Sequence, residues 1–202
     1  MTNMRALIGG TGSPRLVEVP VPEAGPGQVR IRMAAAGVNP FDLAVAAGTL
    51  ADHGVARKLD SYGLGFDVAG TVDQVGEGVA YLVGDEVIAL VGRLELPVKA
   101  QAEYVVVDAS AVAKAPRGAS AVAAATIPLN ALTGVVVIPL RGTDVASVFF
   151  RADAAQLAEV VRLVEAGRVT LRVAGTYPLE KAADAHARLA AGGVRGRLVL
   201  VP

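Results

Sequence analysis

The stretch "ATIPLNALTGVVVIPLRGTDVASVFF" (residues 125–150) changes its pattern in the middle. Its first part has the composition of a helix, although Pro128 interrupts it. Its second part holds two runs rich in β-branched and aromatic residues, 135–138 and 145–150, which are typical of strands. Gly134 lies at the point of change, where its conformational freedom permits an abrupt join. The pattern therefore predicts that a helix meets a pair of strands directly.

The residues before this stretch have the pattern of short strands separated by turns. Alternating apolar residues predict strands at 4–8, 16–22 and 29–33. A helix is expected to start after Asn39 and to end at Gly48, since these residue types are favoured at helix starts and ends. Turns at intervals of about eight to twelve residues are typical of a small barrel or sandwich. The fold class is therefore expected to be mainly β with helices (α+β), with a partly open β-barrel.

The residues after the stretch predict two helices and a closing strand. Apolar residues recur at helical spacing in 152–169, where Asp153 can cap the start of the helix and Gly167 can end it. A second helix is predicted within 177–193, and "RGRLVLVP" (195–202) has the pattern of a strand. His186, on the second helix, is expected to lie on its solvated face.

The composition excludes several classes of function. The net charge is zero and no run of Lys or Arg occurs, so nothing indicates a nucleic-acid partner. The chain has no cysteine, which removes disulfides, thiolate zinc sites and cysteine nucleophiles. The uncharged residues 118–140 contain two prolines and an asparagine, so a membrane span is not expected. The N-terminus lacks a signal-peptide pattern, and a cytoplasmic location is expected. The preference for Arg over Lys suggests a bacterial source.

No dinucleotide-binding motif can be found. That motif needs glycines between a strand and the start of a helix. In "GGTGSP" (9–14) the glycines are followed by a proline and a second strand, which predicts a hairpin turn. Gly76 and Gly78 likewise lie between two predicted strands.

The order of the motifs resembles the medium-chain dehydrogenase/reductases, and within them the zinc-independent quinone oxidoreductase (zeta-crystallin-like) branch. The motifs are "GVNPFD" (37–42), "GFDVAGTVDQVGEG" (65–78), "AEYVVVDA" (102–109) and "AATIPLNALTG" (124–134), and the C-terminal segment is similar too. The resemblance implies a GroES-like barrel beside a Rossmann domain that binds NADPH. A block of about 100–150 residues is missing between the two halves. We therefore expect a barrel domain at 1–130, a junction with remnant Rossmann strands at 131–150, and a returning segment at 151–202.

The resemblance also implies the site residues. Asn39 corresponds to an asparagine beside the nicotinamide and the substrate carbonyl, where its amide can donate to a developing oxyanion. Asp42 follows the same motif, and Thr126 corresponds to a threonine near the nicotinamide. Each has a structural alternative: Asn39 can cap a helix, Asp42 can stabilise the fold and Thr126 can pack within a helix. Ala44 and Ala46 replace a tyrosine and an arginine that the family often has.

Further candidates come from the aromatic residues and from histidine. Phe41, Tyr62 and Phe66 can line an apolar pocket for a planar carbonyl substrate, or can be ordinary core residues. His53 lies in a predicted loop and is a candidate acid or base, with surface exposure as the alternative. Zinc-dependent relatives have a cysteine at the position of Asn39 and a His-Glu pair at that of Phe66 and the next residue, so no metal is expected.

Three functions remain open. The first is the substrate domain of an NADPH-dependent quinone or enone oxidoreductase, which binds no cofactor by itself and is inactive alone. The second is a non-catalytic binding or structural domain that forms a homodimer through residues 135–150, since unpaired strand edges invite pairing. The third is a cofactor-independent cyclase or isomerase that uses the retained pocket.

Overall fold

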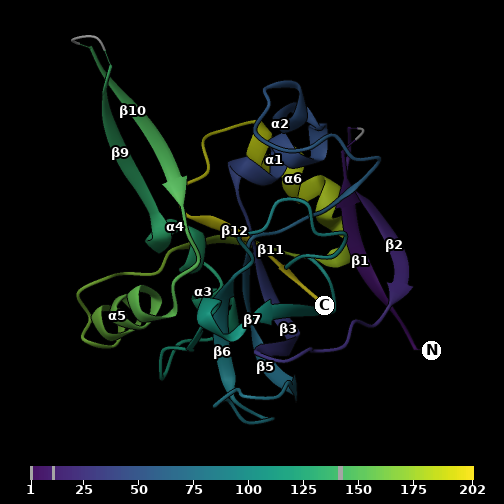
Figure 1. Cartoon of the computed structure of the whole chain (residues 1–202), viewed down its shortest axis with the longest axis vertical. Helices are drawn as coiled ribbons and strands as arrows, with labels where there is room; N and C mark the ends of the chain where they lie inside the picture. Colours follow the sequence, from purple (N-terminus) through teal and green to yellow (C-terminus); the bar gives the residue numbers. More distant parts are fainter. Residues whose placement is uncertain (1, 11, 141–142) are drawn as a thin grey trace.

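The computed structural model describes residues 2–10, 12–140 and 143–202, and it describes the backbone alone at 134–140 and 143–149. Most strands form one mixed sheet of seven strands (Figure 1). In spatial order they are β11 (Val173–Pro178), β12 (Arg197–Val201), β3 (Gln28–Val38), β5 (Asp67–Val75), β6 (Glu86–Leu90) and β8 (Val112–Lys114), and β7 (Tyr104–Asp108) also pairs with β3. Within the described residues the two end strands, β8 and β11, do not pair with each other, so the sheet does not close into a barrel.

Two smaller sheets and short helices complete the fold. One small sheet has the order β2 (Arg15–Pro20), β1 (Asn3–Gly9), β4 (Tyr62–Gly63), and the other pairs β9 (Thr133–Leu140) with β10 (Thr143–Phe150). The helices are α1 (Pro40–Ala47), α2 (Thr49–Asp52), α3 (Ala121–Ala124), α4 (Pro128–Leu132), α5 (Ala154–Glu165) and α6 (Ala182–Ala190), with 3₁₀ turns at Ala109–Ala111 and Leu179–Lys181. The predicted α+β class with a partly open sheet is confirmed.

Local sequence explains where the two best-marked helices begin and end. Asn39 precedes Pro40 at the start of α1, and Gly48 ends the helix with a φ of 77°, which favours glycine. Asp153 caps α5 because its Oδ1 accepts the backbone N–H of Gln156 at 3.0 Å. Both helices thus use the starts that the sequence predicts.

The β9–β10 hairpin projects from the body of the molecule (Figure 1). Its register joins Thr133 to Phe150 and Gly134 to Phe149, so the chain leaves and re-enters the body at neighbouring points. Neither strand pairs with any strand of the other two sheets among the described residues. The predicted direct step from helix to strand pair is confirmed, because α4 ends at Leu132 and β9 begins at the next residue.

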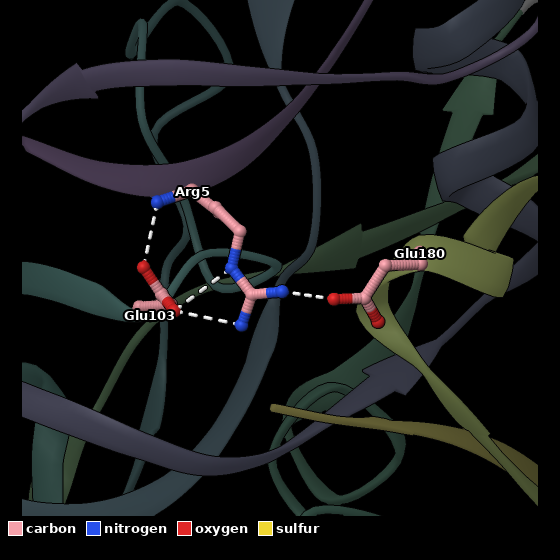
Figure 2. A network of polar contacts seen from close by, with 3 residues as sticks. All are labelled: Arg5, Glu103 and Glu180. Carbon is pink, nitrogen blue, oxygen red and sulfur yellow. Dashed lines mark hydrogen bonds and ion pairs between the residues drawn. The ribbon is translucent and has the colours of Figure 1, made fainter.

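Figure 2 shows an ionic network that joins three distant segments. Arg5, on β1, donates from its Nε and Nη2 to Glu103 Oε1 at 2.9 and 2.8 Å, and its backbone N–H donates to Oε2 at 2.7 Å. The same guanidinium also pairs with Glu180 in the turn before α6. The network fixes the small sheet to the large sheet and to the C-terminal segment.

Where membrane insertion is concerned, the described residues contain no helix with enough length and apolar character to cross a bilayer.

His186 lies inside the molecule, on helix α6, which packs against β12, α1 and β3. Only 4% of its surface is exposed, and its Nε2 lies 3.3 Å from Gln101 Oε1. The prediction of a solvated position was therefore wrong, because the C-terminal segment folds back over the sheet. Burial lowers the pKa of His186 to about 4.

This buried histidine predicts a dependence of stability on pH. The pKa of His186 is about 4 in the folded chain, against an ordinary value of about 6.5 in the unfolded chain. Between these two pH values the folded chain therefore binds fewer protons than the unfolded chain. Stability should therefore fall as the pH is lowered from 6.5 to 4. Relative to His186→Leu, the parent chain should lose about 2–3 kcal/mol of unfolding free energy across this window. Urea unfolding at several pH values measures this loss. His53→Leu, which changes an exposed histidine, is the control. The prediction would be contradicted if the unfolding free energy of the parent chain and that of His186→Leu changed equally with pH.

Candidate functional site

The candidate site is centred on Asn39, at the junction of β3 and α1. The residue is 1% exposed, and its side chain contacts Asp67 on β5. Asp42, one turn into α1, is fully buried and its Oδ2 accepts the backbone N–H of Asn39 at 2.7 Å. Its Oδ1 accepts the N–H of Gly65 at 3.0 Å. Asp42 thus fixes the start of α1 to the chain before β5, which is the structural role considered for it.

Asp67 is a second buried carboxylate beside Asn39. Its Oδ2 accepts a hydrogen bond from Asn39 Nδ2 at 2.8 Å, and its Oδ1 accepts the backbone N–H of Leu129 at 2.5 Å. It therefore joins α1, β5 and α4. Asp67 was not predicted as a site residue, although a carboxylate within the apolar strand "GFDVAG" needs buried hydrogen-bond donors and can be recognised by that need.

Lys99 is a buried cation in the same region. Its side chain is 1% exposed, and its Nζ lies 3.2 Å from the ring centroid of Phe66. Nζ has no hydrogen-bond partner among the described residues. A cation over an aromatic face gains electrostatic energy, but an unpaired buried ammonium is costly. Lys99 was not predicted as a site residue either.

Burial and mutual attraction set the protonation of these groups. Burial raises the pKa of Asp42 to about 6, and the Lys99 charge opposes this rise. Burial also raises the pKa of Asp67, opposed first by its hydrogen bond from Asn39. Burial lowers the pKa of Lys99 to about 7, opposed by the two carboxylates. The site therefore contains acid and base groups whose pKa values lie near neutral pH, which is a feature of functional sites.

The amide of Asn39 is directed toward the carboxylates. Nδ2 approaches Asp67 Oδ2 at 2.8 Å and Asp42 Oδ2 at 3.4 Å, whereas Oδ1 is buried and has no partner among the described residues. Asn39 and Asp42 occupy the positions of a capping box, but only the Asp42 side chain supplies a hydrogen bond. The donor role expected for Asn39 is thus not available in this conformation.

Two of the three predicted pocket aromatics lie together, and Phe150 joins them. Phe41 packs edge-to-face on Phe66 with ring centroids 5.2 Å apart, and Phe150 lies 5.5 and 5.3 Å from these two rings. The Tyr62 hydroxyl donates to Arg57 O at 2.6 Å and so holds the loop after α2. His53 is exposed at the end of α2, and no hydrogen bond or ion pair of the described residues involves its side chain.

Two grooves lie near the site. One, of about 760 Å³, is lined by Phe150 and by residues 90–93 and 96–98. The other, of about 680 Å³, is lined by Pro40 and Thr126, and by Arg172 and Arg197. Thr126 is itself 5% exposed, lies between α3 and α4, and donates from its Oγ1 to Ala123 O at 2.7 Å. Asn39 and Asp42 line neither groove.

Comparison with known proteins assigns the chain to a family. The family model described as zinc-binding dehydrogenase matches residues 62–200, which is more than half of the chain. The chain belongs to this family. Within the medium-chain dehydrogenase/reductase superfamily it is quinone oxidoreductase-like, as the resemblance in sequence predicted.

Individual relatives support the same assignment. The zinc-binding dehydrogenase chain is 37% identical over 145 residues to reticulon-4-interacting protein 1 of Caenorhabditis elegans, covering 65% of this chain and 39% of that protein. The chain spans less than half the length of the curated relatives that it matches. The structure of a quinone oxidoreductase from Coxiella burnetii superposes with a TM-score of 0.82 at 16% identity over 100% of both chains. A mycobacterial protein complexed with NADPH gives a TM-score of 0.75 at 19% identity, over 98% of this chain and 100% of that one. At these low identities the two superpositions establish the fold.

The name of the family refers to zinc binding, but the residues of this chain do not fit a zinc ion. Phe66 offers a phenyl ring, the Asn39 amide directs its N–H groups at carboxylates, and both Asp67 oxygens already accept hydrogen bonds. No cluster of three His, Cys, Asp or Glu side chains suited to a metal occurs in the part of the chain that the structure describes. That the working protein holds no metal stays a prediction.

The Asp67 carboxylate should be essential for stability. Asp67→Ala would leave the buried Leu129 N–H without an acceptor and would leave Asn39 Nδ2 with only its 3.4 Å contact to Asp42 Oδ2. It would also remove one of the two negative charges that act on Lys99, so we expect a loss of about 3–5 kcal/mol of unfolding free energy. Asp73→Ala, on the same strand, removes a partly exposed pair with Arg30 and should cost about 1 kcal/mol or less. Chemical denaturation measures both changes. Similar losses in the two variants would contradict the role assigned to Asp67.

Proposed function

We propose that this chain is the GroES-like substrate domain of an NADPH-dependent quinone or enone oxidoreductase and does not transfer hydride by itself. The observation that carries the proposal is the family's Asn39 motif built into a buried site of Asp42, Asp67 and Lys99 beside three aromatic rings. A planar, apolar carbonyl compound suits the Phe41–Phe66–Phe150 group. The domain boundaries at residue 130 and at residue 150 stay predictions, as does a cytoplasmic location.

Only part of a cofactor site can be identified. NADPH supplies the hydride when it is bound to enzymes of this kind. The groove at Thr126 offers Arg172 and Arg197, and its described lining contains no Asp or Glu, so it suits an anionic group. The chain lacks the glycine-rich turn and helix start that hold a dinucleotide pyrophosphate. We therefore expect weak binding of NADPH at most.

The cofactor-independent cyclase or isomerase is less well supported. Such an enzyme needs a cavity where its acid and base residues meet the substrate. Asn39 and Asp42 are buried and line neither nearby groove, and His53 lies on the surface without contact to them.

Restoring the missing domain tests the proposal. The chain alone, mixed with NADPH and 1,4-benzoquinone, should oxidise NADPH at the rate of buffer. A chimera with the nucleotide-binding domain of the C. elegans relative in place of 134–149 should gain quinone-dependent oxidation of NADPH. The loss of NADPH absorbance measures this oxidation. Rapid turnover by the chain alone would contradict the proposal, as would a folded, NADPH-binding chimera that reduces no quinone or enone.

A second function is favoured by the hairpin alone. We infer that β9 and β10 pair with a second copy of the chain, because a two-stranded hairpin is marginally stable by itself. Its outer strand edges lack a partner among the described residues, and its sequence is strongly apolar. The chain would then be a dimeric binding or structural domain.

Removing the hairpin tests this inference. Because Thr133 pairs with Phe150, a linker of two glycines can replace 135–148 without opening the body. The parent chain should elute as a dimer in size-exclusion chromatography with light scattering, and the shortened chain should elute as a monomer. Replacing the exposed Val55 by Ser is the control for general surface apolarity and should leave the dimer intact. A monomeric parent chain would end the inference.

A further inference from the structure

Two arginines from neighbouring strands line the groove at Thr126. Arg172 precedes β11 and Arg197 begins β12, and these two strands run parallel, so both arginines lie where the strands start. The backbone N–H of Arg197 donates to Arg172 O at 2.9 Å. Gly196 permits this approach, because its φ is 115° and a Cβ at its position would lie 2.7 Å from Arg172 O. The fold therefore brings two guanidinium groups to one groove.

Neither guanidinium group has a carboxylate partner among the described residues. The Arg172 side chain makes no hydrogen bond or ion pair with a described residue, and the Arg197 side chain donates to the neutral amide oxygen of Asn130. The charge of Arg197 also acts on buried Asp67, but both oxygens of that carboxylate already accept other hydrogen bonds. Two cations in one groove repel each other unless an anion lies near both. The pair therefore favours a negatively charged ligand.

Asn130 holds one of the two guanidinium groups in place. Its Oδ1 accepts a hydrogen bond from Arg197 Nη2, and its Nδ2 donates to Thr126 O at 2.9 Å. Arg197 is also half-buried, so its side chain has less freedom to lose when a ligand binds. Because Asn130 is uncharged, it orients Arg197 without neutralising it. The groove thus contains a cation that is already positioned for an anion.

The remaining wall of the groove is mainly apolar. Helices α5 and α6 and the segments that follow them contribute the side chains of Val160, Leu163, Val169, Leu171, Leu189 and Val194. The volume of about 680 Å³ is within the range of small-molecule sites. An inorganic anion would leave this apolar wall in contact with water. A ligand with one negative group and an apolar chain would use both parts of the groove.

We propose that the groove at Thr126 binds a medium-chain carboxylate, with its carboxylate on Arg172 and Arg197 and its alkyl chain against α5 and α6. The planar fork of an arginine can donate two parallel hydrogen bonds to a carboxylate. The site goes beyond the proposed function, which concerns a planar carbonyl compound beside the aromatic group, and it does not depend on that function. A dinucleotide suits the groove less well, because the chain lacks the glycine-rich turn that holds a pyrophosphate.

Calorimetric titration of the whole chain with octanoate tests the proposal. Octanoate should bind at one site per chain. Butanoate should bind more weakly, by up to about fourfold for each methylene removed, because each methylene buries apolar surface. Octan-1-ol has the same chain without the charge and should bind about tenfold more weakly or less tightly still.

An arginine variant tests the charged part of the groove. Arg172→Gln should weaken octanoate binding about tenfold or more, because it removes a charge-assisted hydrogen bond. Arg168→Gln makes the same change at an exposed arginine that does not line the groove, and it should leave the affinity unchanged. Equal affinities of the parent chain and Arg172→Gln would overturn the proposal, and so would a parent chain that does not bind octanoate saturably.

A second variant keeps the test decisive if Arg172→Gln does not fold. Leu163→Glu places a carboxylate in the groove and should abolish octanoate binding, whereas Leu82→Glu, at a leucine that is 71% exposed, should not. NADPH that displaced octanoate at a lower concentration than octanoate itself requires would make the groove a dinucleotide site and end the proposal. None of these titrations measures hydride transfer. An inactive chimera would therefore end the proposed function and leave the carboxylate site as a separate result.

Discussion

The Asp67 carboxylate accepts hydrogen bonds from the Asn39 side chain and from the first turn of α4, and the rest of the site depends on this pair of contacts. Asp67 lies on a strand in the centre of the sheet, where water cannot solvate it, so its oxygens must find protein donors. The two donors lie at the start of α1 and in α4. Satisfying one buried charge therefore places two helices against the sheet.

Lys99 places a buried cation in the same region. Two buried carboxylates in proximity repel each other, and a cation nearby lets both ionise. The ammonium lies over Phe66, a position where zinc-dependent relatives are expected to have a metal ligand, and it forms no hydrogen bond with a described residue. The region thus combines an apolar aromatic wall with buried ionisable groups.

Much of the fold could be predicted because it follows from local patterns. Alternating apolar residues marked β1 and β3, Asn39 and Gly48 marked the ends of α1, and Asp153 marked the start of α5. His186 was placed wrongly, because burial on the inner side of α6 depends on packing against α1 and β3. His53 was a candidate because it lies in a predicted loop, and the structure places it at the exposed end of α2.

The sequence alone determined the order of the strands along the chain, the direct join at Gly134, the lack of a dinucleotide-binding motif and the likeness to quinone oxidoreductases. The tertiary structure decided which end of the Asn39 amide is engaged, that Lys99 is buried, and that Phe150 joins Phe41 and Phe66. The physical reason is separation along the chain. Asn39 meets Asp67 across 28 residues and Asp67 meets Leu129 across 62, so neither contact leaves a local pattern in the sequence. Hydrogen bonds to buried charges appear only when the whole sheet has formed.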